Sequence, residues 1–178
     1  ELGDGIWERD TGGGLSLFGQ AVVKEMNKLG MLVDVAHLAE KGFWHVAEIS
    51  RRPFAVSHAN CSAICPHPRN LNDEQIRYLS QAGGVIGLSF VPEFIDQNRP
   101  DIDAFMRHVE HIASRFGTRC IGLGSDFDGM DKPTPGLNDV TCVSRLVEML
   151  LRRGYSDEEV AGIMGGNWMR LLREVLTE

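Results

Sequence analysis

Four short apolar runs, each followed by an amphipathic stretch, restrict how this chain can fold more than any other feature. The runs cover residues 31–37, 54–58, 84–90 and 120–126. They are rich in β-branched or small residues and too short for helices, which is typical of strands. Strands that are apolar on both faces belong to parallel sheets covered by helices. The sequence therefore predicts an α/β fold in which a helix precedes four βα units.

The stretches between the runs predict helices, and local signals support their ends. The expected helices cover residues 18–29, 38–50, 73–82, 102–116, 140–153, 157–164 and 166–176. Asn72 is placed to cap one of them, and Ser156 with Glu159 has the spacing of a capping box. Gly30, Gly83 and Gly117 lie where helices are expected to end.

The number of βα units conflicts with a complete barrel. A chain of 178 residues has the size of one domain, and we interpret residues 1–178 as a single domain. An eight-stranded (β/α)8 barrel takes about 250 residues, whereas only four units are clear here. The chain is therefore either an open, doubly wound sheet or about half of a TIM-type barrel.

Composition excludes several classes of function. The chain has 18 Lys and Arg against 25 Asp and Glu, a net charge of −7, which argues against a general binder of nucleic acid or of anionic membranes. No apolar run approaches the roughly 20 residues of a membrane span, and no export signal is visible. Cys61 and Cys65 have no second pair with which to form a structural zinc site. We expect free thiols, a reducing compartment and a cytoplasmic location.

Three polar residues end the predicted strands. His37, His58 and Asp126 close the first, second and fourth runs, and ligands of parallel α/β folds bind at the carboxyl ends of strands. Neighbouring strands lie about 4.8 Å apart, so the two imidazoles could ligate one divalent cation or a close pair. The alternative is that each is a structural residue. Helix packing or a loop position is expected for the other four histidines, which are His45, His67, His108 and His111.

Two loops after strands carry further candidates. Arg69 could hold a carboxylate through a two-pronged charge-assisted bond, or it could brace its loop by bonding main-chain carbonyls. Asp126 and Asp128 lie two residues apart on alternating faces, so only one of them can point straight into the mouth of the sheet.

Several runs, taken in order, resemble the membrane (renal-type) dipeptidase family, peptidase family M19. The likeness extends from about residue 14 to 172. It rests on LVDVAH at 32–37, VSHAN at 56–60, PRNL at 68–71, GLGSDFDG at 122–129, LLRRGYS at 150–156 and GGN at 165–167. The resemblance implies a (β/α)8 barrel with two zinc ions that hydrolyses dipeptides, including those with a C-terminal D-residue.

The same resemblance implies roles for individual residues. His37 and His58 would be ligands of the second zinc, Arg69 would grip the terminal carboxylate of the substrate, and Asp126 would handle the proton of the attacking water or the leaving amine. The family's H-x-D pair, its bridging glutamate and a further substrate-binding histidine have no counterparts here, because no histidine precedes His37. We therefore interpret the chain as the C-terminal half of such an enzyme, which alone would coordinate one zinc incompletely and have little activity.

Two other functions are compatible with the same residues. The chain could be a non-catalytic or degenerate barrel homologue that acts as a binding module. It could also belong to a different metal-dependent hydrolase, acting on amides or phosphoesters. The expected partners are a dipeptide substrate and either the missing N-terminal half or a second copy of the chain, with no nucleic acid and no membrane.

Overall fold

The protein contains a three-stranded parallel sheet surrounded by helices, in a computed structural model that describes residues 2–176. The strands are β1 (Ala55–Ala59), β2 (Val85–Leu88) and β3 (Ile121–Leu123), in the order β1-β2-β3. β2 is buried along its whole length, as expected of a central strand with apolar residues on both faces. Its register is continuous with β3, whereas its pairing with β1 is irregular between Val56 and Ala59.

Eight α-helices and three short helical turns complete the described part of the chain. The α-helices are α1 (Leu17–Lys28), α2 (Glu40–Ile49), α3 (Asp73–Gln81), α4 (Pro92–Ile95), α5 (Ile102–Phe116), α6 (Cys142–Arg152), α7 (Asp157–Ala161) and α8 (Asn167–Val175). The turns are η1 (Ile6–Thr11), η2 (Phe127–Gly129) and a π-helical turn, η3 (Gly162–Gly166), between α7 and α8. None of the helices among residues 2–176 has both the length and the apolar character needed to cross a bilayer.

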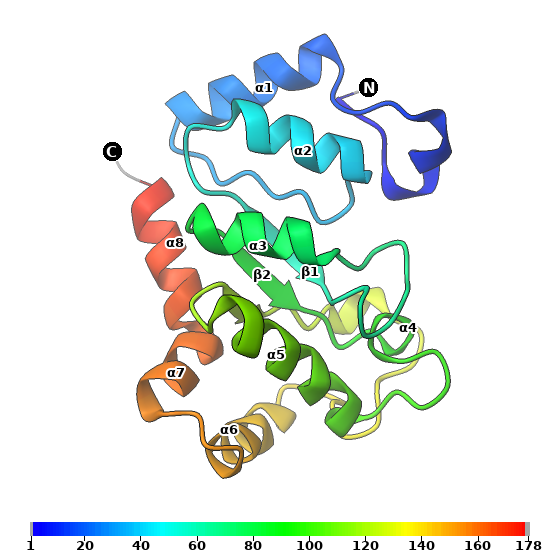
Figure 1. The fold of residues 1–178 in the computed structure, drawn as a ribbon, viewed down its shortest axis with the longest axis vertical. Helices are drawn as coiled ribbons and strands as arrows, with labels where there is room; N and C mark the ends of the chain where they lie inside the picture. Colours follow the sequence, from blue (N-terminus) through cyan, green and yellow to red (C-terminus); the bar gives the residue numbers. More distant parts are fainter. Residues whose placement is uncertain (1, 177–178) are drawn as a thin grey trace.

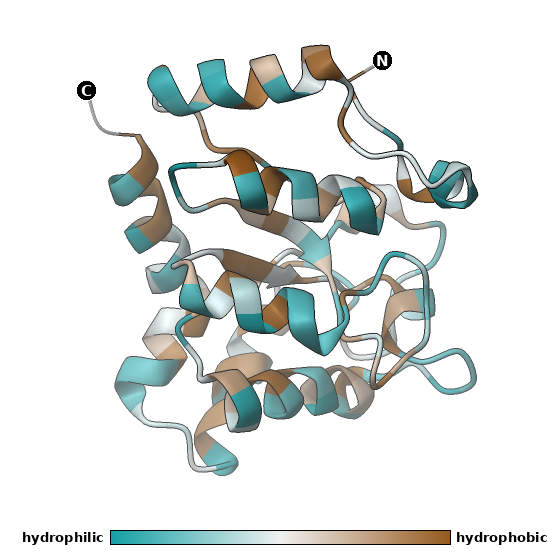
Figure 2. Ribbon diagram, turned by 45° about the horizontal axis from the view of Figure 1, so that its top comes forward, coloured by the Kyte–Doolittle hydropathy of each residue, from teal (hydrophilic) through white to brown (hydrophobic). Residues whose placement is uncertain are grey.

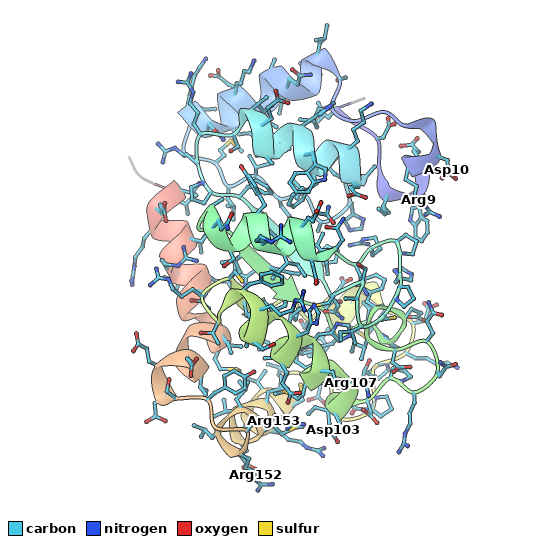
Figure 3. The ribbon with its side chains drawn as sticks, viewed as in Figure 1. Arg9, Asp10, Asp103, Arg107, Arg152 and Arg153 are labelled. Atoms are coloured by element: carbon cyan, nitrogen blue, oxygen red, sulfur yellow. The ribbon has the colours of Figure 1, made fainter. Side chains whose placement is uncertain are left out.

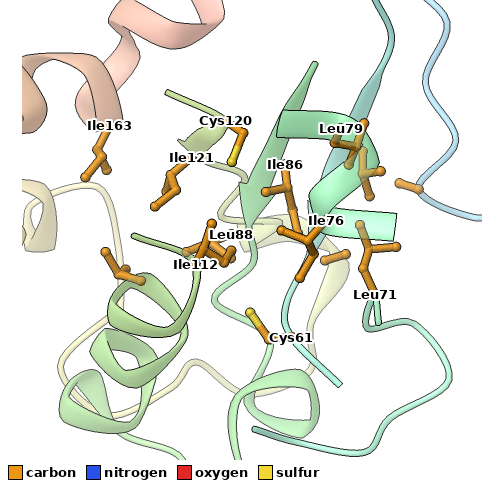
Figure 4. Close-up of a cluster of buried hydrophobic side chains, with 14 of the residues drawn as sticks. Cys61, Leu71, Ile76, Leu79, Ile86, Leu88, Ile112, Cys120, Ile121 and Ile163 are labelled. Atoms are coloured by element: carbon orange, nitrogen blue, oxygen red, sulfur yellow. The ribbon is translucent and has the colours of Figure 1, made fainter. Parts of the chain in front are cut away.

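The sheet is covered on both faces. Ile86, Leu88 and Ile121 pack into a large cluster with side chains of α3 and α5 (Figure 4). Alternate strand residues face the opposite side, where Gly87 and Gly122 leave room for Trp168 of α8. α1 and α2 stack beyond β1, and α6 and α7 lie at the other end of the molecule (Figure 1).

Hydropathy follows this arrangement. The strands and the inward faces of the helices are apolar, and most outer faces are polar (Figure 2). The start of α1 differs, because Leu17 and Phe18 are exposed to 86% and 67%. Arg153, after α6, bonds Asp103 and Glu110 of α5 and so ties these two helices together at the surface (Figure 3).

Most predicted helix ends are confirmed. Asn72 and Ser156 both form capping boxes, and α5 has the predicted bounds. The glycines Gly30, Gly83 and Gly117 all have positive φ, a backbone conformation that glycine adopts more readily than any other residue.

The strand predicted at residues 31–37 does not form over that length. It forms only a short extended segment, in which Val35 N donates to Ala55 O and Ala55 N donates to Val33 O. The pairing stops there because Ser57 N, which would continue the ladder, donates to Asp34 Oδ1, and Val35 O accepts from Leu38 N. The three parallel strands agree with a partial barrel.

Candidate active site

The two candidate imidazoles lie next to each other at the end of the sheet. His37 follows the extended segment 33–35, and His58 lies in the irregular part of β1. Their Nε2 atoms are 2.9 Å apart and their ring centroids 4.8 Å apart. The expected proximity is observed, and their role as metal ligands stays a prediction.

The surroundings favour neutral imidazoles. Partial burial, and then the positive charge of Arg69, lower the pKa of His37 and of His58 below the ordinary value of 6.5. At neutral pH both rings therefore keep a nitrogen lone pair, which is the form that binds metals.

Asp126 completes this group from the other edge of the sheet. Its Oδ2 lies 3.9 Å from His58 Nε2. β3 ends at Leu123, so Asp126 does not close the strand as predicted but lies three residues beyond it, with a left-handed backbone (φ 61°, ψ 37°). A non-glycine residue in this region is uncommon, and such strain is concentrated at functional sites. Asp128 is exposed on the following turn.

Arg69 is buried behind the imidazoles. Its Nε donates to Ala36 O at 3.1 Å and one terminal nitrogen donates to His58 O at 3.4 Å, while its guanidinium stacks 5.2 Å from the ring centroid of Phe94. These bonds brace the loop, as one of the two sequence interpretations expected. They use two of its five N–H groups, which leaves three for a carboxylate.

A cavity of about 640 Å³ lies beside Arg69. Its walls come from η1, the start of α2 and the loop after β1, and neither imidazole lines it. Arg69 is therefore the one member of the candidate set that lines this cavity, and the imidazole pair lies outside its walls.

Two residues of the site were not singled out from the sequence. Asp34 Oδ1 accepts from Ala36 N and Ser57 N. Ser57 Oγ lies 2.8 Å from His58 Nδ1. An acidic residue inside an apolar run was the one available signal for Asp34. Ser57 gave none, because serine is common beside strand ends.

The remaining histidines and cysteines are held within the fold. His45 accepts from Leu15 N, His67 stacks on Phe94, His108 is fully buried in α5, and His111 pairs with Asp73. All four cysteines are free, and all four are buried.

The two imidazoles could supply two ligands of a divalent cation but not a complete coordination shell. Zinc–nitrogen bonds of 2.0–2.1 Å in tetrahedral geometry separate two ligand nitrogens by about 3.3 Å, so a shift of a few tenths of an ångström would bring both imidazoles onto one ion. Among residues 2–176, no three His, Cys, Asp or Glu side chains are grouped closely enough to hold a metal. The pair therefore fits part of a coordination shell.

Known proteins resemble this chain in sequence and in fold. The membrane dipeptidase profile (peptidase family M19) matches residues 3–177. Dipeptidase tcpJ of Claviceps purpurea (strain 20.1) is 41% identical over 164 residues, which are 91% of this chain and 39% of that protein. Dipeptidase verJ of Clonostachys rogersoniana is 38% identical over 163 residues, which are 92% of this chain and 42% of that protein. The chain thus spans about two fifths of the length of these curated relatives.

Solved structures of metallopeptidases have a similar fold. A metallopeptidase from Rhodobacter sphaeroides, liganded with a phosphinate mimic of the dipeptide L-Ala-D-Ala, has a TM-score of 0.85 at 33% identity, covering 91% of this chain and 47% of that one. The dipeptidase AC, an M19 metallopeptidase, has a TM-score of 0.86 at 33% identity, covering 92% and 49%. By sequence and by fold, this chain belongs to the membrane dipeptidase family, peptidase family M19.

Proposed function

We propose that this chain supplies one face of a zinc-dependent dipeptidase, as a single domain that corresponds to the C-terminal half of a (β/α)8 barrel. The observation that carries the proposal is the convergence of the His37 and His58 Nε2 atoms at 2.9 Å beside the Asp126 carboxylate. Family membership and the dipeptidase relatives support the reaction class.

Each residue has a separate task in this proposal. His37 and His58 would hold the metal, with the remaining ligands coming from outside this chain. When bound, a zinc ion lowers the pKa of a water molecule towards neutrality and polarises the scissile carbonyl. Arg69 binds the terminal carboxylate of the dipeptide and so orients the amide bond.

Asp126 moves the proton. Its carboxylate accepts a proton from the attacking water and returns it to the leaving amine, which would otherwise depart as a poor leaving group. Its Oδ2 lies 3.9 Å from His58 Nε2, which places the carboxylate beside the nitrogen that would hold the metal. A dipeptide ending in D-Ala is a suitable first substrate, since a structural relative binds a mimic of one.

A zinc titration tests the metal assignment. We expect His37→Ala and His58→Ala each to weaken zinc binding to this chain by on the order of tenfold or more, because each removes a direct ligand. His111→Asn is the matched control, since His111 pairs with Asp73 on α3 instead. Calorimetry measures the affinities, and unchanged affinity in both alanine variants would refute the proposal.

Hydrolysis of L-Ala-D-Ala by the full-length protein tests the role of Asp126. Asp126→Asn should abolish turnover while zinc stays bound, because the amide cannot accept the proton. Full activity in this variant would exclude Asp126 as the proton carrier, and zinc binding without any dipeptide hydrolysis by the wild type would favour a non-catalytic homologue.

A further inference from the structure

β1 is distorted at the point where it presents His58. The register with β2 shifts between Val56 and Ala59, and such bulges redirect side chains beside active sites. Ser57 N, inside the distortion, does not donate to a strand carbonyl but to Asp34 Oδ1 at 3.0 Å. The same oxygen accepts from Ala36 N at 3.1 Å.

Asp34 therefore joins the two segments that carry the imidazoles. Ala36 precedes His37, and Ser57 precedes His58, so one carboxylate oxygen holds the backbone next to both rings. Two backbone N–H groups that donate to one side-chain oxygen hold the two segments at a fixed spacing. The separation of the rings depends on this connection.

Ser57 contacts the far side of the His58 ring. Its Oγ lies 2.8 Å from His58 Nδ1, while His58 Nε2 lies 2.9 Å from His37 Nε2. The Ser57 backbone is also packed tightly, because a Cβ on Gly87 or Gly124 would lie about 2 Å from Ser57 O (2.1 and 1.9 Å). The backbone that carries the hydroxyl is therefore held in place beside the ring.

We propose that Ser57 and Asp34 are positioning residues for the imidazole pair, Ser57 by accepting a hydrogen bond from His58 Nδ1–H and Asp34 by bonding the backbone beside both rings. The proposal rests on the metal role of the pair proposed above. With the proton on Nδ1, His58 Nε2 carries the lone pair that a metal needs, and the partner of the other nitrogen selects the tautomer of a ligating histidine.

The arrangement has a consequence for His37. If His58 Nε2 is bare, the 2.9 Å contact requires His37 Nε2 to carry a proton and donate it. The two rings therefore have opposite tautomers in the chain without metal, with Nδ1–H on His58 and Nε2–H on His37.

Long-range 1H–15N correlation spectra test the tautomers, because they distinguish the N–H nitrogen of each ring from the bare one. At pH 8, where both rings are neutral, the wild-type chain should show Nδ1–H on His58. Ser57→Ala should convert His58 to a mixture of tautomers, and Ser57→Thr, which keeps a hydroxyl, should restore the wild-type pattern. Ser114→Ala, which deletes a serine hydroxyl bonded to His111 O on α5, is the control. A wild-type His58 with Nε2–H, or an unchanged tautomer in a folded Ser57→Ala chain, overturns the proposal.

Two substitutions at position 34 test the backbone connection. Asn keeps an Oδ1 that can accept both N–H groups, whereas Ala does not. We expect Asp34→Ala to weaken zinc binding about 10- to 100-fold, as loss of the partners that orient ligands does elsewhere, and Asp34→Asn to stay within about threefold of the wild type. Equal losses in the two variants would show that the charge matters and not the hydrogen bonds, which refutes this part of the proposal.

The readouts separate the two proposals. If the imidazole variants lose zinc but Ser57→Ala leaves the tautomer unchanged, the positioning role fails and the metal site stands. If the tautomer shifts as expected but neither imidazole variant changes zinc affinity, the metal assignment fails and the positioning of the rings stands.

Discussion

His108 shows how one buried side chain makes stability depend on pH. It has no exposed surface, accepts from Cys61 N through Nδ1 and donates from Nε2 to Ile95 O. Burial is the largest cause that lowers its pKa to about 4. The neutral ring, with both nitrogens bonded, is therefore part of the folded structure.

We expect the free energy of unfolding to fall as the pH drops from about 6.5 to 4. Between these pH values His108 is protonated in the unfolded chain but stays neutral in the folded chain. Acid therefore favours the unfolded state, and the loss of stability is complete below about pH 4. The shift from 6.5 to about 4 corresponds to about 3 kcal/mol. Urea unfolding at several pH values measures it.

His108→Gln is the comparison, because glutamine does not titrate. The variant is expected to be less stable at pH 7.5 but to lose less stability between pH 6.5 and 4 than the wild type. Equal losses in both proteins would show that other groups cause the acid sensitivity.

At the scale of residues, the sequence predicted the site only in part. His37, His58 and Asp126 could be named because strand ends of parallel sheets carry ligands. Ser57 and Asp34 could not, because their importance comes from a distortion of β1 that no local pattern indicates. The sequence also left open whether Arg69 braces its loop or binds a carboxylate. In the structure it bonds two main-chain carbonyls and keeps further N–H groups for a carboxylate.

At the scale of elements, the close approach of strands requires glycine. Gly124 follows β3 and lies over Ser57, where an added Cβ would lie 1.9 Å from Ser57 O and 2.8 Å from Gly87 O. Both are backbone atoms, which cannot rotate away as a side-chain end can. This contact connects β3 to the distorted part of β1.

Gly124→Ala should destabilise the protein by about 1–3 kcal/mol, the usual cost of overpacking. Gly5→Ala is the control, since a Cβ there would meet nothing closer than 3.7 Å and should change stability by no more than about 0.5 kcal/mol. Thermal or urea denaturation measures both variants, and similar stabilities would contradict the tight contact.

The elements themselves were largely predictable. Amphipathic periodicity and caps placed α5 correctly and the other long helices within about two residues. α4 and the turns η1 and η2 were not expected, because they are too short to show a period. The first strand was overextended, since the apolar run 31–37 does not reveal that the Asp34 side chain takes the N–H of Ser57.

At the scale of the whole molecule, α8 ties distant parts of the chain together. Arg52, before β1, donates from one terminal nitrogen to Val175 O at 2.9 Å and to Glu174 O at 3.3 Å. Arg170 of α8 donates in turn to Gly83 O and Arg119 O. Carbonyls at a helix C-terminus lack partners within the helix, and cationic donors satisfy them well.

Arg52→Ala should loosen α8. We expect a loss of about 1–2 kcal/mol, typical of charged hydrogen bonds, and faster amide hydrogen exchange in α8 than in α5. Arg173→Ala removes an exposed arginine from the same helix and is the control. Exchange measured by mass spectrometry that is equally slow in α8 of both variants would contradict the connection.

Family membership extends over nearly the whole chain, and the sequence was sufficient to recognise it. Several short runs matched in order from about residue 14 to 172, and the family profile matches residues 3–177. The three-stranded sheet of residues 2–176 could not be related to a barrel in the same way, because a closed barrel requires further strands paired at both edges of that sheet.

The left-handed backbone of Asp126 decides which substitutions give interpretable mutagenesis. Asparagine tolerates φ near 61° at least as well as aspartate does, whereas alanine and β-branched residues are strained there. An alanine scan through this turn would combine a conformational penalty with the loss of the carboxylate. Only the asparagine variant separates the two effects.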